Sequence, residues 1–392
     1  MKIIKMDNQG RGITYNNKII FVNNALPNED VEIDVILEKN RYCIADVKKY
    51  NIKSDFRIKP KCEYYDICGG CQLQHLSYDN QINYKIKYLN EIFKPLNISI
   101  LEIETSKQFY YRNKITLQVK NKIGLYKKNS NNLIEIDNCN IVNKKINEKF
   151  KYIKELNLTG IDNIIIKSFN NNVMLVINGK EDKITVGTLK KHFDTIYINN
   201  KLMYGNRLLA QINDVKYYIS PNAFFQVNIE IATKMFEYIK NILKNINAKN
   251  VIDLYCGCGS ISLYIADTVD YIYGIEINES SINDANENKI INNINNVDFL
   301  CNTSDNIKIS NNFDTVIVDP PRSGLSKTLI NKLISSKICN IIYVSCDPIT
   351  LKRDLYELKS KYNIQNIKAF DMFPNTYHVE CISVLERINI EK

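Results

Sequence analysis

The chain has 392 residues, and at roughly 150 residues per domain this length predicts two or three domains. Hydrophobic residues make up 45% of the sequence and aromatic residues 10%, which excludes a wholly disordered chain. Lys and Arg total 52 against 43 Asp and Glu, and the net charge of +9 is compatible with nucleic-acid binding. No apolar run has the length of a membrane span, and the opening MKIIKMDNQG lacks a signal-peptide core. We therefore expect a cytoplasmic protein with no membrane partner.

The first 55 residues have the pattern of short strands separated by turns. Apolar residues alternate most clearly at Val31, Ile33 and Val35, and turn signals occur at residues 10–12 and 28–30. Several short strands at this spacing favour a small barrel of the OB type, which is a common nucleic-acid platform. An ordinary β-barrel without a ligand would have the same pattern. The strands that we expect cover residues 2–6, 18–22, 31–37 and 41–47.

The middle of the chain is expected to form a β-rich central domain over residues 56–220. A cysteine-rich loop at residues 60–75 is followed by a helical stretch from 78 to 93. Later segments have the β-branched composition of strands. These strand-like segments are residues 114–119, 163–167 and 173–177.

From about residue 225 onward, strand and helix patterns alternate, as in a doubly wound parallel sheet. Residues 364–373 and 380–387 then follow as two strands with no helix between them, so we expect an antiparallel last strand. The sequence thus predicts an α/β multidomain protein whose Rossmann-like domain covers residues 221–392. The expected parallel strands are residues 251–255, 271–275, 313–318 and 340–344.

A glycine-rich turn follows the strand at residues 251–255. Gly257 and Gly259 allow the backbone to approach a ligand closely, and Glu276 ends the next strand, where an acid can bind ribose hydroxyls. A dinucleotide site would have a third glycine where this chain has Ser262. The pattern D-x-Y-x-G-x-G with a later acid resembles the cofactor loop of S-adenosylmethionine-dependent methyltransferases. A turn with a purely structural role is the alternative.

Three further residues are expected at the same edge of the sheet. Asp319 and Cys346 each follow a parallel strand, and Glu380 begins the antiparallel last strand. A thiol, a carboxylate and a methyl donor together suit methylation of pyrimidine carbon 5. The thiolate adds to carbon 6, and a base later removes the proton from carbon 5. We therefore predict Cys346 as nucleophile and Glu380 as base, the alternatives being a packing cysteine and an ion-paired surface glutamate.

The whole pattern resembles the bacterial RNA uracil-5-methyltransferase family. The motifs that carry the resemblance are FFQVN (224–228), DLYCGCGS (253–260), DPPRSGL (319–325), YVSC (343–346) and HVE (378–380). The resemblance implies the same nucleophile, Cys346, and the same base, Glu380. The chain departs from the family pattern at Asp347, because the family commonly has Asn after the nucleophile. The residues that it implies for binding S-adenosylmethionine are Gln226, Tyr255, Gly257, Gly259, Ser260, Glu276 and Asp319.

The chain has eleven cysteines, which in a reducing compartment more often bind metal or do chemistry than form disulfides. Cys62, Cys68 and Cys71 form a tight loop that needs a fourth ligand for zinc or an iron–sulphur cluster, and their spacing fits a zinc ribbon poorly. The motif CEYYDICGGCQLQH is similar to that of the family branch with a 4Fe-4S cluster. That resemblance implies Cys139 as the fourth ligand, while His75 is expected to be structural.

The resemblance also implies that residues 1–55 are a TRAM domain, an OB-like RNA-binding module. Branches with both this domain and the cluster usually modify 23S ribosomal RNA, which is therefore the partner that we expect for a monomeric enzyme. Transfer RNA is the alternative substrate, and a non-catalytic iron–sulphur RNA-binding protein is the alternative from another class. The basic residues expected to contact RNA are Arg11, Lys39 and Arg41, with residues 111–114 from the central domain.

Overall fold

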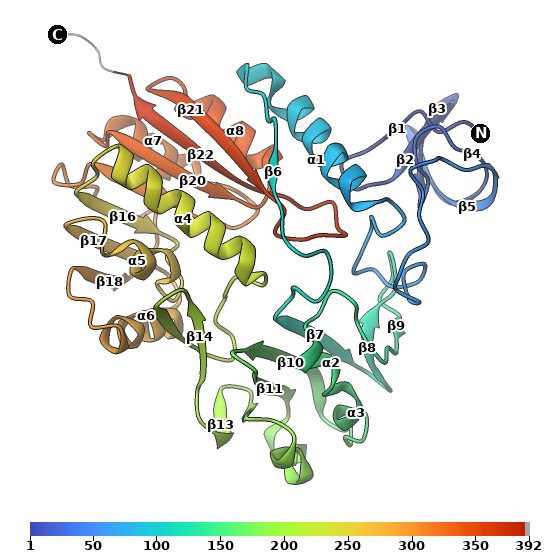
Figure 1. Ribbon diagram of the computed structural model, residues 1–392, viewed down its shortest axis with the longest axis horizontal. Coiled ribbons are helices and arrows are strands. Elements are labelled where there is room, and N and C mark those ends of the chain that lie inside the picture. The colour runs from blue at the N-terminus through green and yellow to red at the C-terminus, as the bar shows by residue number, and fades with distance from the viewer. Residues whose placement is uncertain (389–392) are drawn as a thin grey trace.

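The computed structural model describes residues 1–388, which form three sheet-bearing parts (Figure 1). A five-stranded sheet lies at the N-terminus, a seven-stranded sheet in the middle, and an eight-stranded sheet with helices on both faces at the C-terminus. A hairpin of β14 (Leu208–Ile212) and β15 (Val215–Ile219) links the last two. The expected mixed α/β fold is confirmed. No helix within the described residues is long and apolar enough to cross a membrane.

The N-terminal sheet has the strand order β1-β2-β3-β5-β4. Its two edges meet, because Lys2 bridges Asp30 and the Val31 amide donates to the Met1 carbonyl at 3.0 Å. β2 was not predicted from the sequence, since Gly10 stands just before it, Gly12 is its first residue, and only three apolar or β-branched residues make up its core. The strands are β1 (Lys5–Met6), β2 (Gly12–Asn16), β3 (Lys18–Asn23), β4 (Asp30–Glu38) and β5 (Tyr42–Ile52).

The central sheet has the order β13-β12-β11-β10-β7-β8-β9 and contacts apolar residues on both faces. On one face it packs against the short helices α2 (Lys144–Asn147) and α3 (Phe150–Ile153). The other face joins the core of the C-terminal part through Ile165 and Val176. Its strands are β7 (Lys114–Val119), β8 (Ile123–Tyr126), β9 (Leu133–Ile134), β10 (Ile161–Phe169), β11 (Asn172–Gly179), β12 (Thr195–Ile198) and β13 (Lys201–Gly205).

The C-terminal sheet has the order β18-β17-β16-β19-β20-β22-β21-β6. β16 to β20 are parallel, and β22 runs antiparallel between β20 and β21, which confirms the expected antiparallel last strand. The strand at Val297–Cys301 was missed, because only its first residue is buried. The strands are β6 (Ile103–Glu104), β16 (Asn250–Leu254), β17 (Tyr271–Glu276), β18 (Val297–Cys301), β19 (Thr315–Val318), β20 (Asn340–Ser345), β21 (Tyr362–Phe370) and β22 (Glu380–Arg387).

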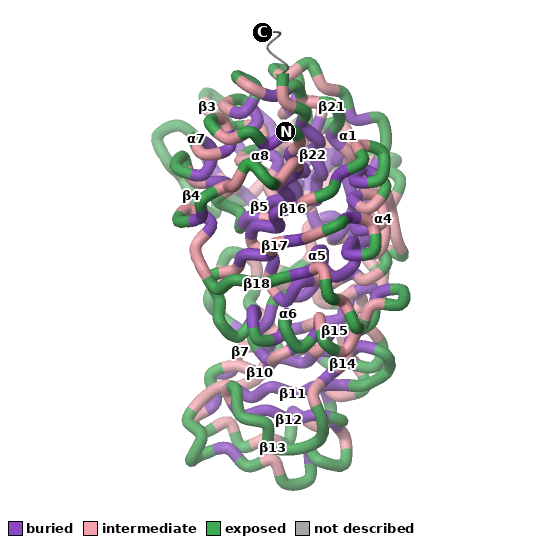
Figure 2. The backbone as a smooth tube through the Cα atoms, turned by 90° about the vertical axis from the view of Figure 1, so that its left-hand side faces the viewer, coloured by how far each residue is buried: buried purple, intermediate pink, exposed green. Residues whose placement is uncertain are grey.

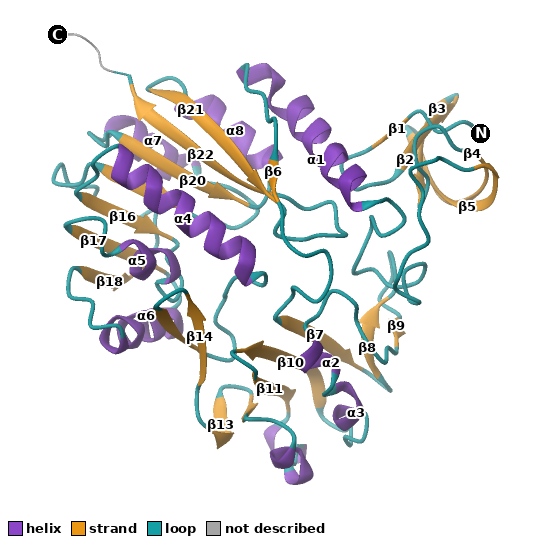
Figure 3. Cartoon of the chain, viewed as in Figure 1, coloured by secondary structure: helices purple, strands orange, loops and turns teal. Residues whose placement is uncertain are grey.

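Alternating side chains of this sheet enter two separate cores. Ile317 and Ile342 pack with α4 (Ile229–Asn245) and α5 (Ser260–Ile265) on one face. Val316, Val318 and Ile341 pack on the other face with α1 (Tyr78–Phe93), α7 (Lys327–Ser335) and α8 (Pro348–Leu358). A further helix, α6 (Glu279–Ile291), contacts β15 and β18. Figure 2 shows buried backbone in the interior of this part, and Figure 3 shows helices beside its strands.

The segment that links the N-terminal and central sheets lies against the C-terminal part. The helix expected at residues 78–93 is confirmed by α1, which contacts α8, and β6 pairs with the edge strand β21. Both α1 and β6 fall within residues 56–220, which were predicted to form a central domain, yet they pack against the C-terminal part. The division into residues 1–55, 56–220 and 221–392 stays a prediction.

Candidate active site

Tyr255, Glu276 and Asp319 meet at the carboxyl edge of the C-terminal sheet. β16 lies between β17 and β19, with Leu254 paired to Ile275 on one side and to Val318 on the other. Tyr255 and Asp319 are the first residues after β16 and β19, and Glu276 is the last residue of β17, so all three lie at the same edge. From β16 the following strands are added first on one side, as β17 and β18, and then on the other, as β19 and β20. In open α/β sheets the ligand crevice lies at such a switch point.

The glycine turn after β16 leaves room for a ligand beside its backbone. Gly257 has a φ of +56°, and a Cβ added there would meet no atom within 4 Å. Gly259 has a φ of +78°, and its added Cβ would lie 2.8 Å from the Phe299 ring. The Gly257 amide donates to Glu276 Oε2 at 3.2 Å, which ties the turn to the end of β17. A side chain at Gly257 would fill the open space and strain the backbone. A side chain at Gly259 would also collide with Phe299.

The segment that carries Gln226 lies beside this turn and is held by the central sheet. The Asn113 amide side chain donates to the Gln226 carbonyl at 2.9 Å, and the Cys258 thiol lies 3.8 Å from the Phe224 carbonyl. Lys167 of β10 is buried and donates to the carbonyls of Ser220 at 2.9 Å and Ala223 at 3.1 Å. The central sheet thus fixes the loop that precedes α4.

Cys346 and Glu380 are brought together by the pairing of β20 with β22. The antiparallel register pairs Ser345 with Cys381, so Cys346 and Glu380 are the next opposed residues. Cys346 is half-buried and Glu380 is 6% exposed. Asp347 caps α8, because its Oδ1 accepts the amides of Ile349 at 2.9 Å and Thr350 at 3.1 Å. The residue that departs from the family pattern therefore keeps the capping role that Asn can also have.

Carboxyl groups crowd this edge of the sheet and change one another's protonation. Burial and the neighbouring Asp253 raise the pKa of Asp319 to about 7. Burial and Asp319 raise the pKa of Glu380 to about 8, while Arg322 opposes the shift. Burial, Glu380 and Asp319 raise the pKa of the Cys346 thiol to about 12. In the ligand-free protein the site therefore favours a neutral thiol and a partly protonated glutamate, and it would attract a cation.

A cavity of about 140 Å³ opens beside Cys346. Asn8 and Gln9 line it from the N-terminal sheet, Tyr88 from α1, and Arg322 and His378 from the C-terminal part. None of these five had a role predicted from the sequence. Arg322 could have been found from the DPPRSGL motif, whereas the turn at Asn8 and Gln9 carries no local signal. Residues from three parts of the chain thus surround the reactive thiol.

The four predicted cluster ligands also share one cavity, of about 170 Å³, which lies between the cysteine loop and the central sheet. Burial and the other three thiols raise the pKa of Cys71 to about 12. No group of His, Cys, Asp and Glu within residues 1–388 is gathered as around a single metal ion. A four-iron cluster is wider than a single ion and takes one thiolate at each corner, so four cysteines around a cavity fit it. His75 is buried and bonds to the Tyr65 hydroxyl, as expected for a structural residue.

Of the segment at residues 111–114, which is expected to reach RNA, Tyr111 and Asn113 are buried, while the basic Arg112 and Lys114 are half-buried, so their contact with RNA stays a prediction. Tyr111 is buried and its hydroxyl donates to the Pro374 carbonyl at 3.0 Å, while Asn113 is buried against Gln226. These two side chains join the central sheet to the C-terminal part, which is why they are not available at the surface.

Comparison with known proteins identifies the family. A family model described as tRNA (Uracil-5-)-methyltransferase matches residues 166–311 and 302–388. The chain belongs to the RNA uracil-5-methyltransferase family. As a member of this family, the protein is an RNA uracil methyltransferase that uses S-adenosylmethionine.

Relatives of this RNA methyltransferase match it over nearly their whole length. An uncharacterized RNA methyltransferase of Staphylococcus aureus is 30% identical over 97% of this chain and 96% of its own. An uncharacterized RNA methyltransferase of Staphylococcus epidermidis is 30% identical over 98% of this chain and 96% of its own. Among solved structures, the Pyrococcus abyssi tRNA (uracil-54, C5)-methyltransferase in complex with S-adenosyl-L-homocysteine is 29% identical. The structural match covers 98% of this chain and 98% of that one, with a TM-score of 0.81.

Proposed function

We propose that the protein methylates carbon 5 of uracil in RNA through a covalent adduct, with Cys346 as nucleophile and Glu380 as base. The observation that carries this proposal is the antiparallel register that opposes Cys346 and Glu380 at the edge of the sheet where Asp319 also lies. Methylation of an exocyclic nitrogen would need no thiol. The arrangement therefore favours methylation at carbon.

The proposed chemistry assigns one task to each group. The sulphur of Cys346 forms a bond to carbon 6 of uracil, which raises the electron density on carbon 5. Carbon 5 then takes up the methyl group, which S-adenosylmethionine would supply from its sulphonium, with S-adenosylhomocysteine as the leaving group. Glu380 removes the proton from carbon 5, and the bond between sulphur and carbon 6 breaks to free both product and enzyme. The raised pKa of Glu380 makes its carboxylate a stronger base for this step.

S-adenosylmethionine, when bound, supplies the methyl group and a positive sulphonium charge. We propose that the residues implied by the family resemblance hold it, and the open side of Gly257 and the acid of Glu276 support this assignment. A positive charge beside Asp319 and Glu380 favours their carboxylate forms, and it also favours the thiolate of Cys346. The crowded carboxyls therefore fit a cationic ligand. The proposed binding residues are Gln226, Tyr255, Gly257, Gly259, Ser260, Glu276 and Asp319.

We further propose that Cys62, Cys68, Cys71 and Cys139 hold a 4Fe-4S cluster and that residues 1–55 are an RNA-binding TRAM domain. The cavity shared by the four sulphurs supports the first assignment, and the closed five-stranded sheet supports the second. Protein purified without oxygen should contain about four iron atoms and absorb visible light. Zinc without iron would contradict the cluster.

We propose 23S ribosomal RNA as the substrate, because the family branch with both a TRAM domain and a cluster usually modifies it. The full-length similarity to the Pyrococcus abyssi tRNA (uracil-54, C5)-methyltransferase favours transfer RNA as the second candidate. The test is to map 5-methyluridine by mass spectrometry in both RNAs from cells with and without the protein. A uridine whose methylation disappears, and returns with the wild type but not with Cys346→Ala, identifies the substrate. If no 5-methyluridine changes in either RNA, the proposed function is wrong.

A further inference from the structure

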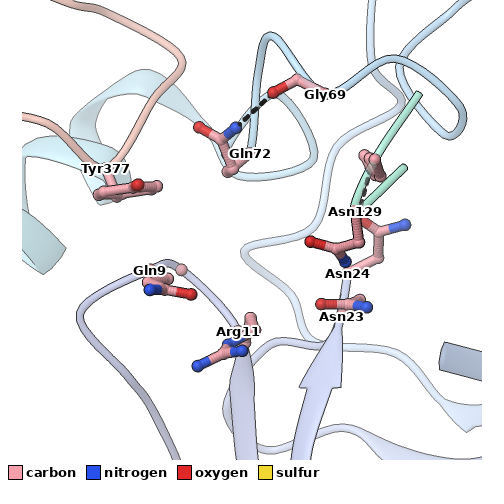
Figure 4. Close-up of a pocket in the computed structure, with 10 residues that line it drawn as sticks. Gln9, Arg11, Asn23, Asn24, Gly69, Gln72, Asn129 and Tyr377 are labelled. Carbon is pink, nitrogen blue, oxygen red and sulfur yellow. Dashed lines mark hydrogen bonds between the residues drawn. The ribbon is translucent and has the colours of Figure 1, made fainter. Parts of the chain in front are cut away.

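A second cavity, of about 170 Å³, adjoins the one beside Cys346. The two cavities share Gln9 and Tyr377 in their linings, so an occupant of one lies next to an occupant of the other. The second cavity is also lined from the cysteine loop by Gln72 and from the β8–β9 turn by Asn129. Figure 4 shows these side chains around an open space, with Tyr377 and Gln72 on one side and Asn129 on the other.

The lining of this cavity is rich in side-chain amides. The side-chain amides of Gln9 and Asn129 make no hydrogen bond with any other group in the described part of the chain, although the backbone amide of Gln9 donates to Asp7 Oδ1 at 2.9 Å. Amide side chains can donate and accept together, which is how Asn and Gln read the edges of bases. Tyr377 is half-buried and offers an aromatic ring on which a base can stack.

Gln72 gives the lining a directional feature. Its amide nitrogen donates to the Gly69 carbonyl at 2.9 Å, which fixes the orientation of the side chain. Its Oε1 is buried and has no hydrogen-bond partner within residues 1–388. A buried acceptor without a donor is unfavourable, so a ligand that brings a donor would be preferred.

The charges around the cavity suit a nucleotide. Arg11 and Lys128 line it and no Asp or Glu does, but the Arg11 guanidinium is paired with Asp7 at 2.6 Å, so Lys128 is the main positive charge. Lys128 is held by Asn24, whose Oδ1 accepts from its Nζ at 3.1 Å. The volume is below the ~300 Å³ at which pockets for drug-sized ligands begin, and it therefore suits a single base rather than a second cofactor.

We propose that this second cavity binds the base of an unpaired nucleotide beside the target uridine, and that Gln72 selects bases with an exocyclic amino group. This inference rests on the proposed function, because it places the target uracil beside Cys346. Adenine, guanine and cytosine all carry such an amino donor. The base-edge donor of uracil, its ring N3–H, lies between two carbonyl oxygens, which the Gln72 oxygen would repel.

The experiment uses a pool of short RNAs of random sequence in which 5-fluorouridine replaces every uridine. The wild-type protein and S-adenosylmethionine should trap members of the pool as covalent complexes, whose RNA is then sequenced around the attachment site. At one neighbouring position, an amino-bearing base should exceed 5-fluorouracil by about tenfold or more. Gln72→Met, which keeps the length of the side chain but removes the amide, should reduce this preference to about twofold.

Gln365→Met is the matched control, because Gln365 is exposed on β21 and lies outside both cavities, and it should keep the preference. Gln9→Leu, at an exposed position, should also lower the preference. Trapping without a neighbour preference, or a preference that both Gln72→Met and Gln9→Leu leave unchanged, would overturn this inference alone. If the pool yields no trapped RNA at all, the proposed function fails and the inference fails with it.

Discussion

At the scale of single residues, the site is dominated by carboxyl groups that are costly to ionise. Glu380 is buried beside Asp319, and Asp319 is in turn affected by Asp253, whose pKa burial raises to about 7. Each group makes its neighbour harder to deprotonate, and the thiol of Cys346 stands at the end of this series. In the ligand-free protein the ionised forms of these groups therefore repel one another, and a bound cation would stabilise them.

Replacement of Glu380 by Gln should stabilise the ligand-free protein, and more so at high pH. The carboxyl ionises near its ordinary value of 4.5 in the unfolded chain but near 8 in the folded one, so the wild type loses stability as the pH rises through this range. Gln does not ionise. The gain in unfolding free energy should be roughly 3 kcal/mol larger at pH 8 than at pH 5, as measured by urea denaturation.

Glu386→Gln serves as the control for this comparison, because Glu386 is exposed on the same strand. It should change stability little at either pH. An equal effect of Glu380→Gln at pH 5 and pH 8 would mean that Glu380 is not buried in the way described.

The chemistry of these residues could be predicted from the sequence better than their surroundings. The motifs around Cys346 and Glu380 lie at strand ends, and strand ends are defined by local apolar runs. The contributions of Gln9 and Tyr88 to the same cavity depend on packing between parts of the chain that are far apart in sequence. No local pattern encodes such packing, so these residues could not be found.

At the scale of elements, the junction of β20 and α8 fixes the position of the nucleophile. Cys346 is the single residue between the end of the strand and the capping Asp347, and Pro348 begins the helix. Pro at the first helical position and a side-chain cap both favour a helix start at this place. The thiol is thus held by a rigid strand on one side and a capped helix on the other.

Asp347→Ala should cost about 1 kcal/mol of stability and also slow methyl transfer, because the cap that holds the start of α8 is lost. Asp347→Asn should change stability by less than about 0.5 kcal/mol, since Asn caps as well as Asp. Ser326→Ala removes the cap of α7, where the serine hydroxyl accepts the Leu329 amide at 3.0 Å. That variant should lose similar stability but keep its activity. If Asp347→Ala is as active as Ser326→Ala, the cap does not position Cys346.

Most elements of the C-terminal sheet follow from the sequence, because buried parallel strands are continuous apolar runs. The antiparallel β22 could be predicted for a different reason, since the connection before it is too short for a helix. β6 could not, because two residues carry no periodicity and their pairing with β21 depends on the whole fold.

At the scale of the whole molecule, α1 joins the N-terminal sheet to the catalytic part. Lys85 of α1 and Asp371, which follows β21, form a fully buried ion pair at 2.5 Å. The Tyr78 hydroxyl donates to the other oxygen of Asp371 at 2.8 Å, and the Tyr84 hydroxyl donates to the Asp7 carbonyl. The turn that carries Asn8 and Gln9 is therefore tied through α1 to the loop between β21 and β22.

Lys85→Met should destabilise the protein by about 3–5 kcal/mol, because it leaves the carboxylate of Asp371 buried without its cation. Addition of Asp371→Asn should restore much of this loss, since the pair is then neutral. Chemical denaturation of the two variants measures both effects. A double variant that is less stable than Lys85→Met alone would show that the buried charge is not the cause.

The central claim is that Cys346 forms a covalent bond to carbon 6 of an RNA uracil. Fluorine at carbon 5 cannot be removed as a proton, so RNA that contains 5-fluorouridine should stall the reaction after methyl transfer. With S-adenosylmethionine present, we expect a protein–RNA complex that survives denaturing electrophoresis and whose digest attaches the nucleotide to the peptide containing Cys346. Cys346→Ala should form none. Absence of the complex with the wild type, or the same complex with Cys346→Ala, would contradict the claim.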